Sequence, residues 1–151
     1  MGTTIVAIGA SAGGVEALAE LFDAMPDDTG LAFVIVQHMA RGRPSMMAEI
    51  LSNRTSMQVT QIRTGDSPTP NTVHVIPPGV HLSIEDGILT LTDSDADDRL
   101  HLPIDLFFKS LAEDQGSKTY AIVLSGTGSD GTIGIEAIKA AGGVTFAQLA
   151  N

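Results

Sequence analysis

Apolar runs and amphipathic segments alternate along the first part of the chain. The uninterrupted apolar run at residues 5–8 is typical of a strand that is buried on both faces, as in a parallel sheet. Residues 15–25 instead place apolar side chains at the spacing of one helix face, and Pro26 ends that pattern. A second apolar run at 31–37 predicts another buried strand, and residues 45–54 predict a short helix.

The middle of the chain has the pattern of short strands joined by turns. Residues 57–62 and 72–77 are strand-like runs that are separated by a connector rich in turn-forming residues. Residues 81–92 alternate apolar and polar positions around Asp86-Gly87, a dipeptide that favours a two-residue hairpin turn. The acidic stretch at 93–98 is interpreted as a solvated surface loop, with a cation or partner site as the alternative.

The last third returns to alternating helices and strands. Pro103 opens a predicted helix that Gly116 ends, and a buried strand is predicted at 119–126. A helix at 132–141 and the start of a strand at 144–148 follow. The whole pattern predicts an α/β fold with a doubly wound, mostly parallel sheet flanked by helices and with an inserted β-hairpin.

Length, charge and cysteine content narrow the class of protein. At 151 residues the chain has the size of one domain, and it shows neither an internal repeat nor a linker-like stretch. Its formal net charge of −10 disfavours nucleic acid or an anionic membrane as a partner, because either would need a basic surface. The chain has no cysteine, which excludes a disulfide scaffold, a thiolate nucleophile and a cysteine-ligated metal.

The sequence carries no sign of a membrane segment or a metal site. It begins directly in a strand pattern without a basic leader, and no apolar stretch is long enough to span a bilayer. We therefore expect a cytoplasmic protein without membrane insertion. No two histidines have the i, i+4 spacing of a helical metal site, and we expect neither a metal nor another cofactor.

Three polar residues follow predicted strands, and their side chains are those of a serine hydrolase. Ser11 comes after the first strand, His38 after the second and Asp130 after the strand at 119–126. Because the carboxyl ends of parallel strands share one edge of a sheet, we expect these residues to lie close together. A neutral imidazole accepts the proton of an attacking serine, and a carboxylate orients that imidazole and stabilises its charged form.

The turn around Ser11 also fits nucleophilic catalysis. Gly9 to Gly13 match the G-x-S-x-G pattern, in which small residues allow a strained strand-to-helix elbow. Backbone N–H groups near Ala12, at the start of the following helix, are candidates for holding a developing oxyanion. The glycine-rich loop around Thr127 offers a second candidate donor.

Each of these residues also has a structural interpretation. The glycines are compatible with an ordinary turn, and His38 with a hydrogen-bonded structural histidine. Asp130 or Ser129 is equally suited to cap the helix that follows. The order Ser, His, Asp differs from the Ser, Asp, His order of the α/β-hydrolases, so that particular fold is not implied.

A dinucleotide site is disfavoured at two positions. The G-x-G-x-x-G pattern needs glycine where Ser11 stands. It also needs an acidic residue near the end of the second strand, where this chain has Gln37 and His38.

Four sequence blocks together resemble one family. They are GASAGG with Ser11, VQHM with His38, VIPPGVHL, and LSGTGSDG with Asp130. In content, order and spacing they are similar to the catalytic domain of the bacterial chemotaxis receptor methylesterases, the CheB family. The stretch HLPIDLFFKSLAEDQG is similar to the subtype in which this domain is fused to the opposing methyltransferase.

The resemblance implies a reaction and a role for each residue. The reaction is hydrolysis of glutamyl methyl esters on the cytoplasmic helices of chemoreceptors, with release of methanol, and often deamidation of receptor glutamines. Ser11 would be the nucleophile, His38 the general base and then acid, and Asp130 the orienting carboxylate. The backbone N–H groups of Ala12 and Thr127 would be the oxyanion donors.

The resemblance also implies partners and a domain organisation. The partners are the cytoplasmic domain of a methyl-accepting chemoreceptor and a methyltransferase domain in the same full-length chain. Family members continue past the last strand, so we expect residues 1–151 to be a catalytic domain that is truncated at its C-terminus and has no receiver domain. The alternative function is a regulatory or interaction module that keeps this fold without catalysis.

Overall fold

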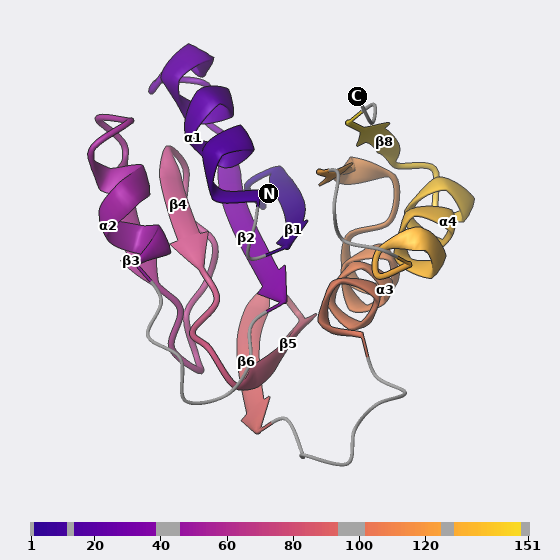
Figure 1. Ribbon diagram of the computed structural model, residues 1–151. Helices are drawn as coiled ribbons and strands as arrows, with labels where there is room; N and C mark the ends of the chain where they lie inside the picture. Colours follow the sequence, from indigo (N-terminus) through magenta and orange to yellow (C-terminus); the bar gives the residue numbers. More distant parts are fainter. Residues whose placement is uncertain (1, 12–13, 39–45, 94–101, 125–128, 149–151) are drawn as a thin grey trace.

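A computed structural model describes residues 2–11, 14–38, 46–93, 102–124 and 129–148. Helices and strands alternate along the chain as the sequence pattern predicts (Figure 1). The elements are β1 (Ile5–Ser11), α1 (Val15–Ala24), β2 (Ala32–His38), α2 (Met47–Ser52), β3 (Gln58–Gln61), β4 (Thr72–Val75), β5 (Val80–Glu85), β6 (Ile88–Asp93), α3 (Pro103–Gln115), a 3₁₀ turn (Gly116–Lys118), β7 (Thr119–Val123), α4 (Thr132–Ala140) and β8 (Val144–Ala147).

Six strands form one parallel sheet in the order β3-β4-β2-β1-β7-β8. Every neighbouring pair in it is parallel, which confirms the predicted fold class. Strands β2, β3 and β4 lie on one side of β1, and the chain then crosses back to place β7 and β8 on the other side. The topological switch point therefore lies beside β1, and in open α/β sheets ligands bind at the carboxyl ends of the strands there.

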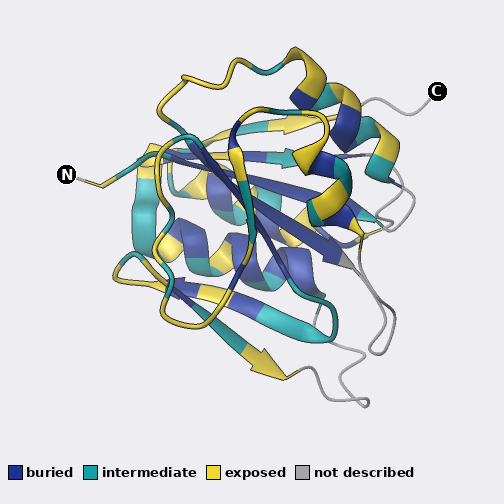
Figure 2. Ribbon diagram, turned by 90° about the vertical axis from the view of Figure 1, so that its left-hand side faces the viewer, coloured by how far each residue is buried: buried dark blue, intermediate teal, exposed yellow. Residues whose placement is uncertain are grey.

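Alternate residues of the central strands face two separate cores. Val6 and Ile8 of β1 pack with Leu18 and Phe22 of α1 on one face, where α2 also packs. Alternating with them, Ile5 and Ala7 point to the opposite face, which is covered by α3, α4 and the hairpin. Figure 2 shows the central strands as the most deeply buried part of the molecule. Burial on both faces explains why the first strands are continuous apolar runs.

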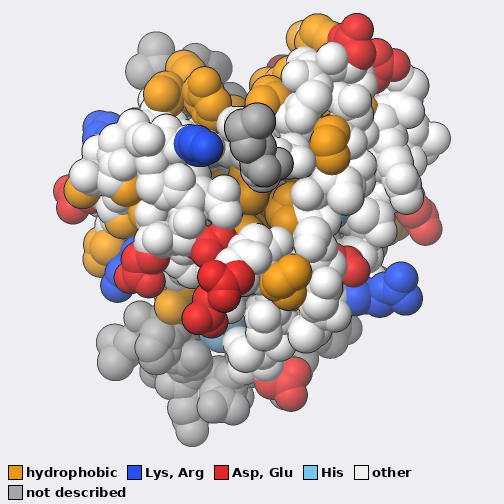
Figure 3. Space-filling model, turned by 180° about the vertical axis from the view of Figure 1, so that it is seen from behind, with side chains coloured by type: hydrophobic (Ala, Val, Ile, Leu, Met, Phe, Trp, Pro, Cys, Tyr) orange, Lys and Arg blue, Asp and Glu red, His pale blue; other side chains and the backbone are white. Residues whose placement is uncertain are grey.

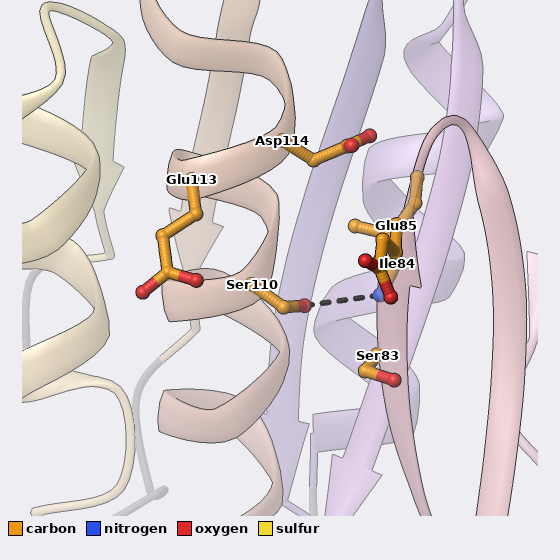
Figure 4. A pocket seen from close by; sticks show the side chains of 6 residues that line it. All are labelled: Ser83, Ile84, Glu85, Ser110, Glu113 and Asp114. Carbon is orange, nitrogen blue, oxygen red and sulfur yellow. Dashed lines mark hydrogen bonds between the residues drawn. The ribbon is translucent and has the colours of Figure 1, made fainter.

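Strands β5 and β6 form a separate antiparallel hairpin. Its two loop residues, Asp86 and Gly87, have φ angles of 52° and 75°, as a primed two-residue turn requires. The predicted hairpin is thereby confirmed. It is attached to α3, where Ser110 Oγ accepts a hydrogen bond of 3.1 Å from Ile84 N–H (Figure 4). The Asp114 carboxylate accepts two more, from the N–H groups of both loop residues.

Most predicted boundaries lie within two residues of those in the structure, and the ends of β1 and β7 differ by three. Helix α3 begins at Pro103 and ends at Gly116, whose φ of 61° favours glycine, as predicted. Helix α2 begins at Met47, two residues later than predicted. Strand β7 ends at Val123 rather than at 126. Residues 125 and 126, and residues 94–98 of the acidic stretch, lie outside the described residues.

Candidate active site

Ser11 and His38 lie side by side. The parallel register of β1 and β2 pairs the two residues, and each is the last residue of its strand. Paired residues on neighbouring strands stand about 4.8 Å apart in the hydrogen-bonding direction. The imidazole of His38 lies outside what the structure describes, so its contacts with Ser11 stay a prediction.

A hydrogen bond between the two strands holds the end of β1. The side-chain Nε2 of Gln37 donates to the backbone oxygen of Ser11 over 3.3 Å, and the Gln37 side chain is buried. The bond satisfies a carbonyl at the point where the strand ladder stops. The sequence indicated only that Gln37 is not the acidic residue that a dinucleotide site needs. Nothing in the sequence indicated this bond.

Helix α1 begins very close to Ser11. A Cβ atom on Gly14 would lie 3.3 Å from Ala10 Cβ and 3.9 Å from Ser11 Oγ. Gly14 is the N-cap of α1, and as a glycine it has no side chain that could cap the helix. The positive end of the helix dipole therefore faces the serine, a favourable place for an oxyanion. The predicted donors Ala12 and Thr127 lie outside the described residues.

Asp130 occupies the other side of β1. It follows β7, which pairs with β1 on the edge opposite to β2, and its side chain is only 4% exposed. Its carboxylate accepts hydrogen bonds from the N–H groups of Ile104, over 3.2 Å, and of Asp105, over 3.0 Å. Asp130 thus caps α3. The structural alternative expected Asp130 or Ser129 at the cap position of the helix that follows, whereas the N-cap of α4 is Gly131.

Asp105 completes this arrangement from α3. Its Oδ1 accepts hydrogen bonds from Gly131 N–H, over 3.0 Å, and from Gly134 N–H, over 2.7 Å. Asp105 is 7% exposed, and it caps α4 as Asp130 caps α3. The sequence pattern did not single out Asp105. The one available signal was an acidic side chain in the first turn of a helix opened by Pro103.

Close packing ties α3 to the strand that carries Ser11. A Cβ atom on Gly9 would lie 2.6 Å from Ile104 Cγ2, so only glycine leaves room for α3 at this point. Ile104 belongs to the same helix turn that binds the Asp130 carboxylate. The position of Asp130 is therefore linked to β1 only two residues before Ser11.

The other described polar features are separate from this edge. His74 on β4 is buried, and its Nε2 accepts a hydrogen bond from Thr69 N–H over 3.1 Å. Burial lowers the pKa of His74 from its usual 6.5, so a neutral structural role fits it. Within the described ranges, no three His, Asp or Glu side chains are grouped to hold a metal ion. No helix among the described residues is long and apolar enough to cross a membrane.

A polar groove of about 440 Å³ lies between α3 and β5 (Figure 4). It is lined by Ser83, Ile84, Glu85, Ser110, Glu113 and Asp114. Asp114 stands nine residues beyond Asp105, about 14 Å along α3 at the rise of an α-helix. The groove therefore belongs to the end of α3 that is remote from Asp130.

The comparisons with known proteins agree with this architecture. The family model described as CheB methylesterase matches residues 6–151. The chain belongs to the CheB methylesterase family. The crystal structure of the CheB methylesterase catalytic domain of Thermotoga maritima superimposes on this chain with a TM-score of 0.83 at 31% identity. The match covers 96% of this chain and 79% of that one. The family expected from the four sequence blocks is thereby confirmed.

Curated CheB relatives are longer than this chain. The protein-glutamate methylesterase/protein-glutamine glutaminase 2 of Burkholderia lata is 38% identical over 146 residues, which cover 96% of this chain and 43% of the relative. The similarly named protein 1 of Carboxydothermus hydrogenoformans is 35% identical, with 97% and 45% covered. The chain thus spans less than half of the length of these relatives. The roles of Ser11, His38 and Asp130 stay predictions.

Proposed function

We propose that this chain is the catalytic domain of a serine hydrolase that acts on glutamyl methyl esters. The substrate is the cytoplasmic domain of a methyl-accepting chemoreceptor, and the product is methanol; glutamine deamidation is the second reaction. The observation that carries the proposal is the β1–β2 register, which ends both strands at the pair Ser11 and His38. Membership of the CheB family and the names of the curated relatives support the substrate class.

In the proposed reaction, Ser11 Oγ attacks the ester carbonyl while His38 accepts the serine proton. The tetrahedral intermediate collapses, the carbon–oxygen bond to the methoxy group breaks, and His38 returns the proton so that methanol leaves. Water then attacks the acyl-enzyme with His38 as base, which releases the glutamate and restores Ser11. On a glutamine, the leaving group of the same sequence is ammonia.

Two electrostatic features support this chemistry. The start of α1 beside Ser11 suits the negative charge that develops on the carbonyl oxygen, with Ala12 and Thr127 as the proposed backbone donors. Asp130 is assigned to orient the His38 imidazole and to stabilise its protonated form. The Asp130 carboxylate is buried and accepts two backbone N–H bonds, which hold it in place.

The proposal extends to location and to the longer chain. Chemoreceptor methylation sites face the cytoplasm, so we place the enzyme there. Similarity of the segment at 101–116 to the fused subtype supports a methyltransferase domain in the same full-length chain.

Ser11→Ala tests the proposal in the full-length protein. We expect methanol release from methylated receptor to fall at least about 10³-fold, because the nucleophile is lost. Ser83→Ala is the matched control, since Ser83 is exposed on β5, and it should keep wild-type turnover.

A serine-directed fluorophosphonate probe separates catalysis from a purely binding module. The wild type and Ser83→Ala should be labelled, and Ser11→Ala should not. Undiminished methanol release by Ser11→Ala would overturn the proposed mechanism. Absence of labelling in the folded wild type would favour the non-catalytic module.

A further inference from the structure

We propose that Asp105 is a positioning residue for Asp130, which it holds at the catalytic edge of the sheet through reciprocal caps between α3 and α4. The inference rests on the proposed function, in which Asp130 orients His38. Asp105 lies outside the Ser-His-Asp set, and its replacement should change turnover measurably.

Four hydrogen bonds join the two helix starts. Asp130 accepts from Ile104 and Asp105 at the start of α3, and Asp105 accepts from Gly131 and Gly134 at the start of α4. All four donors are backbone N–H groups that a helix leaves unsatisfied in its first turn. Each carboxylate thus lies at the positive end of the other residue's helix, which compensates two buried negative charges placed close together.

The caps hold Asp130 on two sides. Its carboxylate is bound by the start of α3, and its backbone is held because the next residue, Gly131, donates to Asp105. Gly131 has a φ of 108°, which glycine adopts readily and other residues disfavour, so the turn next to Asp130 requires glycine. Loss of the Asp105 acceptor would free the segment that carries Asp130.

Close packing extends this restraint to β1, the strand that ends at Ser11. Gly9 lets Ile104 approach β1 closely, and Gly134 lets α4 approach α3, where a Cβ atom would lie 2.6 Å from Phe108 Cβ. The two helices and β1 therefore behave as one packed unit. A displaced Asp130 would lose its placement relative to His38, and misplacement by about 1 Å costs up to about 10²-fold in rate.

A positioning role differs measurably from simple stabilisation. A residue that only stabilises the fold changes the folded fraction, whereas a positioning residue changes kcat of the folded enzyme. A carboxylate close to an imidazolium raises the pKa of that histidine. Displacement of Asp130 should therefore move the acid limb of the kcat/KM profile to lower pH as well as lower its plateau.

The test uses Asp105→Ala and Asp105→Asn in the full-length protein, with Asp114→Ala as matched control. Asp114 lies on the same helix and also accepts two backbone N–H bonds, but at the remote end. Turnover of methylated receptor and the rate of fluorophosphonate labelling are measured where circular dichroism shows each variant folded. We expect Asp105→Ala to lower kcat at least about tenfold with KM within about twofold.

The two other variants have different expected results. Asp105→Asn keeps an oxygen at the position that accepts both bonds, so it should recover most of kcat. Asp114→Ala should keep wild-type kcat and pH profile. Where Asp105→Ala fails to fold, Asp105→Ser replaces it: its single hydroxyl is a partial cap, and an intermediate kcat is expected.

The outcomes separate this inference from the proposed function. If the wild type is labelled at Ser11 and folded Asp105→Ala matches Asp114→Ala in kcat and pH profile, the inference alone is overturned. Failure of Asp105→Asn to exceed Asp105→Ala also overturns it. If the wild type shows no labelling that depends on Ser11, the proposed function fails and the inference fails with it.

Discussion

His74 shows how burial alone makes a histidine sensitive to acid. Its Nε2 accepts the Thr69 N–H bond, which leaves the proton of the neutral ring on Nδ1, and that atom has no partner among the described residues. Burial lowers its pKa, and the nearby Asp66 carboxylate opposes the shift only in part. The folded protein therefore binds a proton at this ring less readily than the unfolded chain does.

This shift predicts a loss of stability on acidification. Well above pH 6.5 the ring is neutral in both states, and as the pH falls through 6.5 the unfolded chain takes up a proton first. The free energy of unfolding should fall by up to about 1.4 kcal/mol per pH unit until the folded ring also titrates. His74→Gln retains an acceptor for Thr69 and should flatten the pH dependence of the free energy of unfolding, measured by urea titration between pH 7.5 and 5. If the free energy of unfolding changes equally with pH in the wild type and the variant, His74 is not the cause of the pH dependence.

At the scale of single residues, the sequence indicates the proposed catalytic residues better than it indicates the groups that hold them. Ser11, His38 and Asp130 were predicted because each follows a strand, a position that local pattern reveals. The bonds of Asp130 to α3 were not predictable, because they join residues 25 and 26 positions apart through the tertiary packing. Nothing local to Asp105 distinguishes a cap of α4 from an ordinary acidic residue in a first helix turn.

The crossing of α3 and α4 sets the next prediction. A Cβ atom on Gly134 would lie 2.6 Å from Phe108 Cβ and 3.2 Å from the backbone Cα of Asp105. Alanine favours a helix over glycine by about 1 kcal/mol, but here it would push the helices apart. Gly134→Ala should therefore lower the free energy of unfolding by about 1–3 kcal/mol in urea titrations. Gly2→Ala, with nothing within 4 Å, should be neutral, and a stabilised Gly134→Ala would contradict the close crossing.

Elements defined by local chemistry were predictable, and their order in the sheet was not. The Asp86-Gly87 turn and the Pro103 and Gly116 helix ends are set by backbone preferences that the residues themselves carry. The start of α2 was predicted two residues too early, because Pro44 and Ser45 are typical of a helix start. The placement of β7 beside β1 joins segments that are far apart in the chain, such as Ile5 and Thr119, and periodicity does not report such contacts.

Over the whole molecule, the two faces of the sheet are covered unequally. Helices α1 and α2 cover β1 to β4, while the same face of β7 and β8 leaves Tyr120, Val144 and Phe146 exposed. Register places Tyr120 beside Val144, and Ile122 beside Phe146. An apolar hollow of about 350 Å³ results, lined by Val6, Met25, Leu31, Phe33, Tyr120, Ile122 and Phe146. Figure 3 shows hydrophobic side chains lining a hollow on the side of the molecule opposite to Figure 1.

This hollow predicts a surface property of the 151-residue chain. Contiguous exposed apolar surface binds hydrophobic dyes and favours self-association, and β8 adds an open strand edge. The folded chain should therefore enhance the fluorescence of anilinonaphthalene sulfonate and sediment in a concentration-dependent way.

Phe146→Glu should reduce both effects, because Phe146 is 55% exposed within the hollow. Ile133→Glu is the matched control: Ile133 is 58% exposed but stands on α4, away from the hollow, and the added charge is the same. Equal loss of dye binding in the two variants would show that general charge repulsion, and not the apolar hollow, sets the surface behaviour.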